Sequence, residues 1–119
     1  MNLEEKKKWA CIFLRVGLAA VFLYAAIASL IDPVAWEGFI PAFIKGIVDV
    51  HLFSLTHSIF EIILALWLLW GKKVYYPATI GGLEMLAVML FNLGIFDVLF
   101  RDIAIFFAAA ALVILTLDD

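Results

Sequence analysis

An apolar stretch near the start of the chain most constrains how it can fold. From Trp9 to Ile31 the sequence carries one charged residue, Arg15, and it ends at Asp32-Pro33. About 20 apolar helical residues span the hydrocarbon core of a bilayer, and proline disfavours continuation of a helix. A secretory signal has a shorter apolar core followed by a cleavage site. We therefore expect a retained transmembrane helix over about residues 9–31.

The composition argues against a water-soluble fold. Of the 119 residues, 67% are hydrophobic and 16% are charged, whereas a typical soluble domain is about half apolar and a quarter charged. A chain this short could not hide so much apolar area from water. The net charge of -3 gives no basic excess that would favour a nucleic-acid partner. The lipid bilayer is the expected partner.

Three further segments approach the length of a membrane crossing, at about residues 52–70, 75–96 and 101–117. The last is the shortest, because its apolar part, residues 103–117, reaches only about 22 Å as a helix. Either the preceding charged pair enters the membrane or the bilayer thins there. The predicted fold class is all-α, an integral membrane four-helix bundle that forms a single domain over the whole chain.

The segment between the first two crossings, residues 33–51, mixes aromatic and aliphatic residues with Glu37, Lys45 and Asp49. It is too apolar for a free loop and too often interrupted for a membrane crossing. An amphipathic helix lying in the membrane interface accounts for this pattern, and Pro41 would break it or begin its second part.

Lysine placement predicts the orientation, since basic residues accumulate on the cytoplasmic side. Lysines 6–8 precede the first crossing, and Lys72 and Lys73 join the second to the third. Both groups fall on the same side of a four-crossing chain. We expect a multi-pass protein of the cytoplasmic (plasma) membrane with both termini in the cytoplasm.

Ionisable residues within the apolar segments are the candidate site. Counted from the cytoplasmic ends of their helices, Arg15 lies about 9 Å deep and Glu61 and Glu84 each about 13 Å deep. Such residues usually face the interior of a bundle, so we expect these three to meet there. His57 precedes Glu61 by four residues and shares its helix face. The predicted buried polar or ligand-binding cluster is Arg15, Glu61, Glu84 and His57.

The charges leave the role of this cluster open. One guanidinium cannot neutralise two carboxylates, so either one Glu is protonated, because desolvation favours the neutral acid, or His57 contributes. An Arg–Glu pair can simply hold helix register. Arg15 can also extend its side chain to the cytoplasmic interface, and His57 can be a hydrogen-bonded interfacial residue. The remaining alternative is binding of a proton, an ion or a ligand.

A second polar group is expected on the outer side. Asp97 and Arg101 have helical i,i+4 spacing if the third helix continues that far, and Asp32 ends the first crossing on the same side. With Asp102 they form the predicted outer polar cluster. The alternative for Arg101 and Asp102 is a solvated helix cap.

Several cofactor chemistries are excluded within one chain. A single cysteine, Cys11, permits neither an internal disulfide nor a Cys-rich metal site, and no metal site is predicted. His51 and His57 are six residues apart near one membrane face, which does not suit axial ligation of haem from both sides. Gly81-Gly82 lies within an expected helix and favours close helix packing rather than phosphate binding.

The order of these motifs resembles the DoxX-like family of small four-helix bacterial and archaeal membrane proteins. The matching features are the Leu14–Ala26 run closed by Asp32-Pro33, Glu61 followed by apolar residues and a basic turn at Gly71, and Phe100–Ala104 before an Ala- and Leu-rich stretch. The resemblance covers nearly the whole chain and implies a four-helix bundle in the cytoplasmic membrane.

By that resemblance, the chain is expected to be an accessory or quinone-interacting subunit of a membrane redox complex, as in thiosulfate:quinone oxidoreductase. Arg15, Glu61, Arg101 and Asp102 match the family's polar positions. The expected cofactor is none within the chain, with quinone as a possible ligand, and the expected partner is a membrane protein or a second copy. Two alternatives remain: a small proton-coupled transporter with Glu61 or Glu84 as the carrier, and a purely structural membrane partner.

Overall fold

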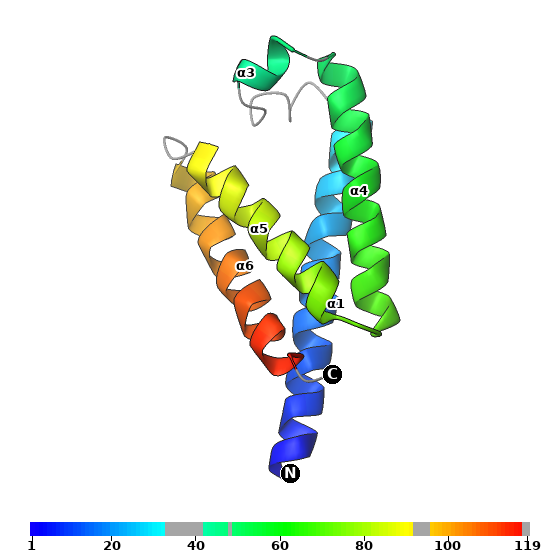
Figure 1. Ribbon diagram of the computed structural model, residues 1–119, viewed down its shortest axis with the longest axis vertical. Coiled ribbons are helices and arrows are strands. Elements are labelled where there is room, and N and C mark those ends of the chain that lie inside the picture. Colours follow the sequence, from blue (N-terminus) through cyan, green and yellow to red (C-terminus); the bar gives the residue numbers. More distant parts are fainter. Residues whose placement is uncertain (33–41, 48, 92–95, 118–119) are drawn as a thin grey trace.

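The computed structural model describes residues 1–32, 42–47, 49–91 and 96–117, and within these residues the chain is helical (Figure 1). The helices are α1 (Leu3–Ile31), α3 (Ala42–Lys45), α4 (Val50–Trp70), α5 (Tyr75–Phe91) and α6 (Phe96–Leu115). The predicted all-α class with four long helices is confirmed.

The predicted interfacial segment, residues 33–51, is only partly described. Residues 33–41 and 48 lie outside the described residues. The described part contains the single-turn helix α3, and α4 already begins at Val50. The expected boundary was therefore two residues late. Asp49 explains the start of α4, because its side chain accepts a hydrogen bond from the backbone N–H of His51 at 2.9 Å, which satisfies one of the free donors of the first turn.

Local capping also sets the start of α1 and the end of α4. α1 begins six residues before the predicted membrane crossing, because the Asn2 side chain accepts a hydrogen bond from Glu5 N at 2.8 Å. α4 ends at Gly71, which has a positive φ of 84°, a conformation that glycine adopts without steric cost.

The boundary between the third and fourth long helices differs from the prediction. Phe96 was expected to end the third helix, but it is the first residue of α6. The described part of α5 ends at Phe91. Arg101 and Asp102 therefore do not begin the last helix but lie inside it, since neither residue interrupts a helical backbone. At 20 residues, α6 is about 30 Å long, so its length matches the hydrocarbon core.

The long helices form two closely packed pairs, α1 with α4 and α5 with α6, and fewer contacts join α1 to α6 and α4 to α5. In Figure 1 the α5–α6 pair is inclined to the α1–α4 pair, and the two pairs meet at the α4–α5 turn. The start of α1, the α4–α5 turn and the end of α6 lie at one end of the molecule, and α3 lies at the other. Both lysine groups of the sequence are therefore at the same end.

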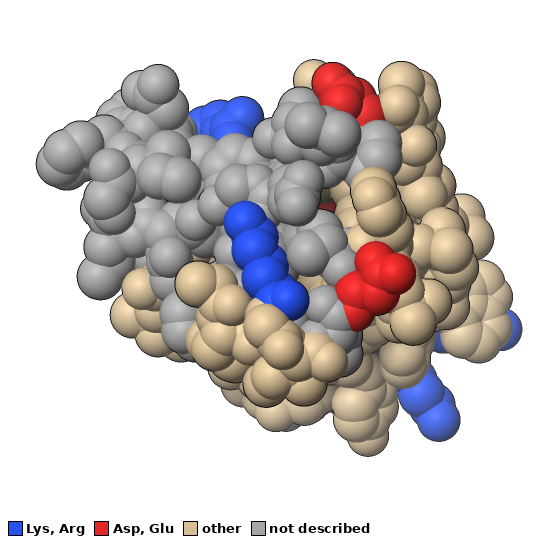
Figure 2. Space-filling model, turned by 90° about the horizontal axis from the view of Figure 1, so that it is seen from above, with Lys and Arg blue, Asp and Glu red and all other residues tan. Residues whose placement is uncertain are grey.

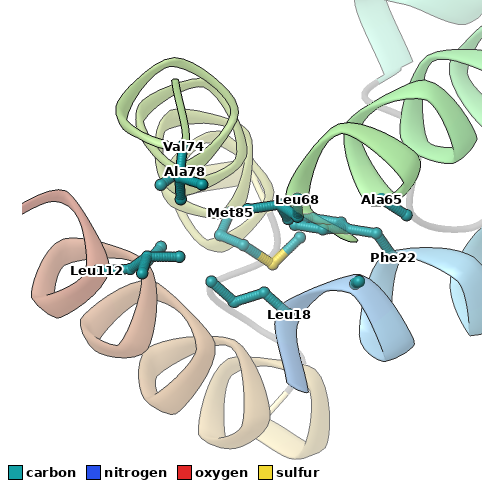
Figure 3. Close-up of a cluster of buried hydrophobic side chains, with 10 residues drawn as sticks. Leu18, Phe22, Ala65, Leu68, Val74, Ala78, Met85 and Leu112 are labelled. Atoms are coloured by element: carbon teal, nitrogen blue, oxygen red, sulfur yellow. The ribbon is translucent and has the colours of Figure 1, made fainter. Parts of the chain in front are cut away.

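The core lies where the two pairs meet. Leu18 and Phe22 of α1 pack there with Leu68 of α4, Met85 of α5 and Leu112 of α6 (Figure 3). Each of these side chains is at most 8% exposed. One small cluster thus joins all four long helices.

Glycines allow α5 to approach its neighbours closely. A Cβ atom on Gly81 would lie 2.8 Å from Phe22 Cζ, and one on Gly82 would lie 3.3 Å from Ala109 Cβ. The first distance is shorter than van der Waals contact, so the Phe22 ring occupies the space that a side chain would need. The close packing expected at Gly81-Gly82 agrees with these contacts.

Apolar side chains also cover much of the outer surface. Phe13, Tyr24, Leu83 and Ile114, for example, are 61–72% exposed. Two helices, Leu3–Ile31 and His51–Trp70, are long and apolar enough to cross a membrane, and only 22% and 28% of their most apolar stretches are buried. Figure 2 views the end that carries α3, where acidic and basic side chains both occur.

Candidate functional site

His57 is the centre of the only group of metal-ligating side chains found in the described part of the chain. It lies on α4, one helical turn before Glu61, and its Nδ1 atom is 2.9 Å from Glu61 Oε1. The i,i+4 spacing directs both side chains to one face of the helix, so this half of the cluster is built within a single helix.

Glu84 completes the group from a second helix. Its Oε1 atom contacts Nε2 of His57, so the imidazole ring lies between two carboxylates. Because Glu84 lies on α5, the histidine joins α4 to α5, a pair of helices that otherwise share few contacts. We call His57, Glu61 and Glu84 the Glu–His–Glu cluster.

The three side chains differ in their access to the surroundings. The Glu61 and Glu84 side chains are 6% and 11% exposed, whereas that of His57 is 37% exposed. Two aromatic rings flank the histidine. Phe53 is nearly parallel to it, with ring centroids 6.1 Å apart, and the Phe60 centroid lies 6.4 Å away. The imidazole is thus the accessible part of the cluster, in an aromatic setting.

Each of the two contacts between a His57 nitrogen and a carboxylate oxygen accommodates one proton. The ring is either an imidazolium between two carboxylates or a neutral imidazole between a carboxylate and a carboxylic acid. Both arrangements leave one net negative charge. Within the described residues, neither carboxylate forms an ion pair with a lysine or arginine, and Glu84 Oε2 is buried without a hydrogen-bond partner.

The Arg15 side chain lies at the end of α4, whereas its depth along α1 predicted a position beside the two glutamates. Its Nε donates to the backbone carbonyl of Leu68 at 2.8 Å and its Nη2 to that of Leu69 at 3.1 Å. The last carbonyls of a helix have no partner within the helix and carry partial negative charge. They therefore attract the guanidinium toward the end of α4. The alternative prediction, in which the Arg15 side chain extends toward the cytoplasmic interface, has the same direction.

The four residues of the predicted outer cluster come from two different elements. Asp32 is the C-cap of α1, whereas Asp97, Arg101 and Asp102 lie on the first two turns of α6. The side chain of Asp97 lies outside what the structure describes. Arg101 is exposed, and Asp102 is 7% exposed. Burial of this aspartate inside a helix differs from the solvated cap that was its alternative.

One polar contact and one buried hydroxyl group were not anticipated from the sequence. Ser29 of α1 and Ser54 of α4 share a hydrogen bond of 3.0 Å between their hydroxyl oxygens. Ser58, next to His57, is 1% exposed, and its hydroxyl has no partner among the described residues. The available signal was the presence of small polar residues within apolar helices, which commonly mark helix contacts in membranes.

An apolar groove of about 220 Å³ lies between α1 and α6. Its lining consists of Phe13, Leu14, Gly17, Leu18, Val21, Ala104, Ile105 and Ala108. None of these residues belongs to the Glu–His–Glu cluster, so the groove and the cluster are separate features.

Comparison with known proteins found no matching protein-family model, no similar curated protein and no similar solved structure.

Proposed function

We propose that this chain is an integral membrane protein that interacts with quinone as an accessory subunit of a membrane redox complex. The observation that carries the proposal is the half-exposed His57 between Phe53 and Phe60, held by two buried glutamates. The resemblance to DoxX-like proteins supports the same assignment, and electrons would come from a redox partner protein.

The outer surface supports the membrane setting. Contiguous apolar surface on a soluble monomer is normally limited to a few hundred Å², whereas each long helix of this chain exposes large apolar side chains. Lipid satisfies such a surface. Four crossings place the start of α1, the α4–α5 turn and the end of α6 in the cytoplasm, where their lysines are favoured.

This topology predicts the activity of reporter fusions. Alkaline phosphatase, which is active only outside the cytoplasm, is expected to be inactive when fused before Leu3 or after Leu117, and active when inserted after Lys45. Green fluorescent protein at the same three positions is expected to give the opposite pattern. Phosphatase activity at either terminus would contradict the four-crossing orientation.

The geometry around His57 suits a quinone head group. A quinone is a planar ring with two carbonyl acceptors, so it needs an N–H donor and apolar or aromatic surroundings. The hydrogen bond would come from Nε2–H of His57, which contacts Glu84 Oε1 in the structure and would exchange that carboxylate for a quinone carbonyl while Glu61 holds Nδ1. The flanking phenylalanines can contact the ring. The long apolar tail of a quinone would lie in the bilayer, against the exposed apolar surface of α4.

Binding of a short-chain benzoquinone to the protein in lipid nanodiscs tests this proposal. We expect saturable binding to the wild type and a loss of at least tenfold in affinity for His57→Gln, equivalent to about 1.4 kcal/mol. His51→Gln is the matched control, because His51 lies on the same helix, is exposed, and is outside the cluster. Equal binding to all three proteins, or to none, would contradict the proposal.

Glu61→Gln separates the alternatives. Loss of quinone binding with intact assembly supports the redox role. Loss of proton-coupled flux in proteoliposomes, with no quinone binding in the wild type, would instead indicate a transporter. Loss of assembly alone would indicate that the cluster is purely structural.

A further inference from the structure

The Glu–His–Glu cluster has the donor set of a metal site. One nitrogen and two carboxylate oxygens, one from each side chain, all lie within 4.8 Å of one another. Imidazole nitrogen and carboxylate oxygen are the usual ligands of Zn²⁺, Fe²⁺ and Mn²⁺ in proteins. Because the ligands come from both α4 and α5, an ion bound here would join two helices that otherwise share few contacts.

Charge favours a divalent ion over a monovalent one. When a metal ion replaces the proton on one ring nitrogen, a neutral imidazole and two carboxylates remain, and one divalent ion balances their two negative charges. Buried charge without compensation is costly, and within the described residues no lysine or arginine forms an ion pair with either glutamate.

A second observation is that buried oxygen atoms of Glu84 and of Ser58, the residue after His57, have no hydrogen-bond partner among the described residues. They are Oε2 of Glu84 and the hydroxyl oxygen of Ser58. Buried polar atoms in native proteins nearly always have a partner. A metal ion between the ring and the carboxylates would give Glu84 Oε2 a ligand.

We propose that His57, Glu61 and Glu84 bind one divalent transition-metal ion through one imidazole nitrogen and the two carboxylates. The second ring nitrogen keeps its proton and donates a hydrogen bond to a carboxylate oxygen, as metal-bound histidines commonly do. This inference goes beyond quinone binding and does not depend on it.

Titration of the metal-free protein with Zn²⁺ alone tests the site. The protein carries no polyhistidine tag and is studied in detergent or nanodiscs, with calorimetry for affinity and elemental analysis after dialysis for stoichiometry. We expect one Zn²⁺ per chain, and a higher midpoint temperature of unfolding when Zn²⁺ is present, because a ligand that binds only the folded state stabilises it. Co²⁺ in place of Zn²⁺ is expected to give absorption bands of a nitrogen- and oxygen-ligated ion.

Variants assign the ligands. Glu84→Gln and Glu61→Gln, which keep side-chain shape, are each expected to weaken Zn²⁺ binding at least about tenfold, and His57→Gln to abolish it. His51→Gln is expected to bind like the wild type. Absence of binding to the wild type would overturn the inference, as would binding that survives the Glu84→Gln, His57→Gln double substitution or is lost in His51→Gln.

The two proposals fail separately. Zn²⁺ binding without quinone binding would overturn only the proposed function, and quinone binding without Zn²⁺ binding would overturn only the metal site. Both measurements use the wild-type protein, so they do not depend on whether a variant folds.

Discussion

Replacing His57 by leucine is expected to lower the free energy of unfolding by about 3–5 kcal/mol, the usual cost of removing one partner from a buried ionic group. The substitution leaves Glu61 and Glu84, both largely buried, without the donor that lies between them. Reversible unfolding of the protein in mixed micelles measures the change.

A matched variant tests whether the lost donor is the cause. Replacing all three members of the Glu–His–Glu cluster by leucine is expected to recover most of the stability, because apolar groups can substitute for a complete buried ionic network at little or no cost. If the triple variant is as unstable as His57→Leu, packing around position 57 rather than the buried carboxylates explains the loss.

Gly71→Ala is expected to destabilise the protein by about 2.5–5 kcal/mol, since two effects add. The positive φ of 84° costs a residue with a Cβ atom about 1–2 kcal/mol. The new Cβ would also lie 2.5 Å from Nη2 of Arg15, displacing a guanidinium whose hydrogen bonds contribute about 1.5–3 kcal/mol. Thermal or denaturant unfolding in detergent measures the sum.

Two further variants separate these effects. In an Arg15→Met background the collision is absent, so Gly71→Ala is expected to cost only the backbone strain. Gly17→Ala is the control for adding a methyl group, because no atom lies within 4 Å of its Cβ position. This control is expected to be neutral or stabilising by up to about 1 kcal/mol, as for glycine inside a helix. An equal cost of Gly71→Ala in both backgrounds would show that Arg15 does not occupy the space beside Gly71.

The helices were predictable from sequence because each is a long apolar run, and the ends at Ile31, Trp70 and Tyr75 agree with the predicted bounds. The starts of α1, α4 and α6 differ from the prediction. The N-caps Asn2 and Asp49 extend α1 and α4 beyond their apolar parts, and a count of apolar residues does not register a cap. Likewise, the cost of placing charge in lipid predicts that the last helix begins at Arg101 and Asp102. The backbone of α6 nevertheless continues through them, since helical hydrogen bonding does not depend on side-chain polarity.

The candidate site shows a similar limit. Helical rise gave Glu61 and Glu84 equal depths, and the i,i+4 spacing placed His57 beside Glu61. Both relations depend on where the backbone carries the residue. The position of Arg15 depends instead on the direction of a long flexible side chain, which selects the carbonyl oxygens at the end of α4. The depth of Arg15 along the helix does not predict which direction its side chain takes.

The attachment of Arg15 to backbone oxygens has a consequence for sequence variation. Every residue type supplies the same carbonyl group, so substitution of the half-exposed Leu69 leaves the acceptor in place. The contribution of Arg15 to the register of α1 against α4 therefore depends on the arginine and on Gly71, which leaves room for it, and not on the side chains at the acceptor positions. The outward-facing side chain of Leu69 can therefore change while the hydrogen bonds from Arg15 continue to hold α1 against α4.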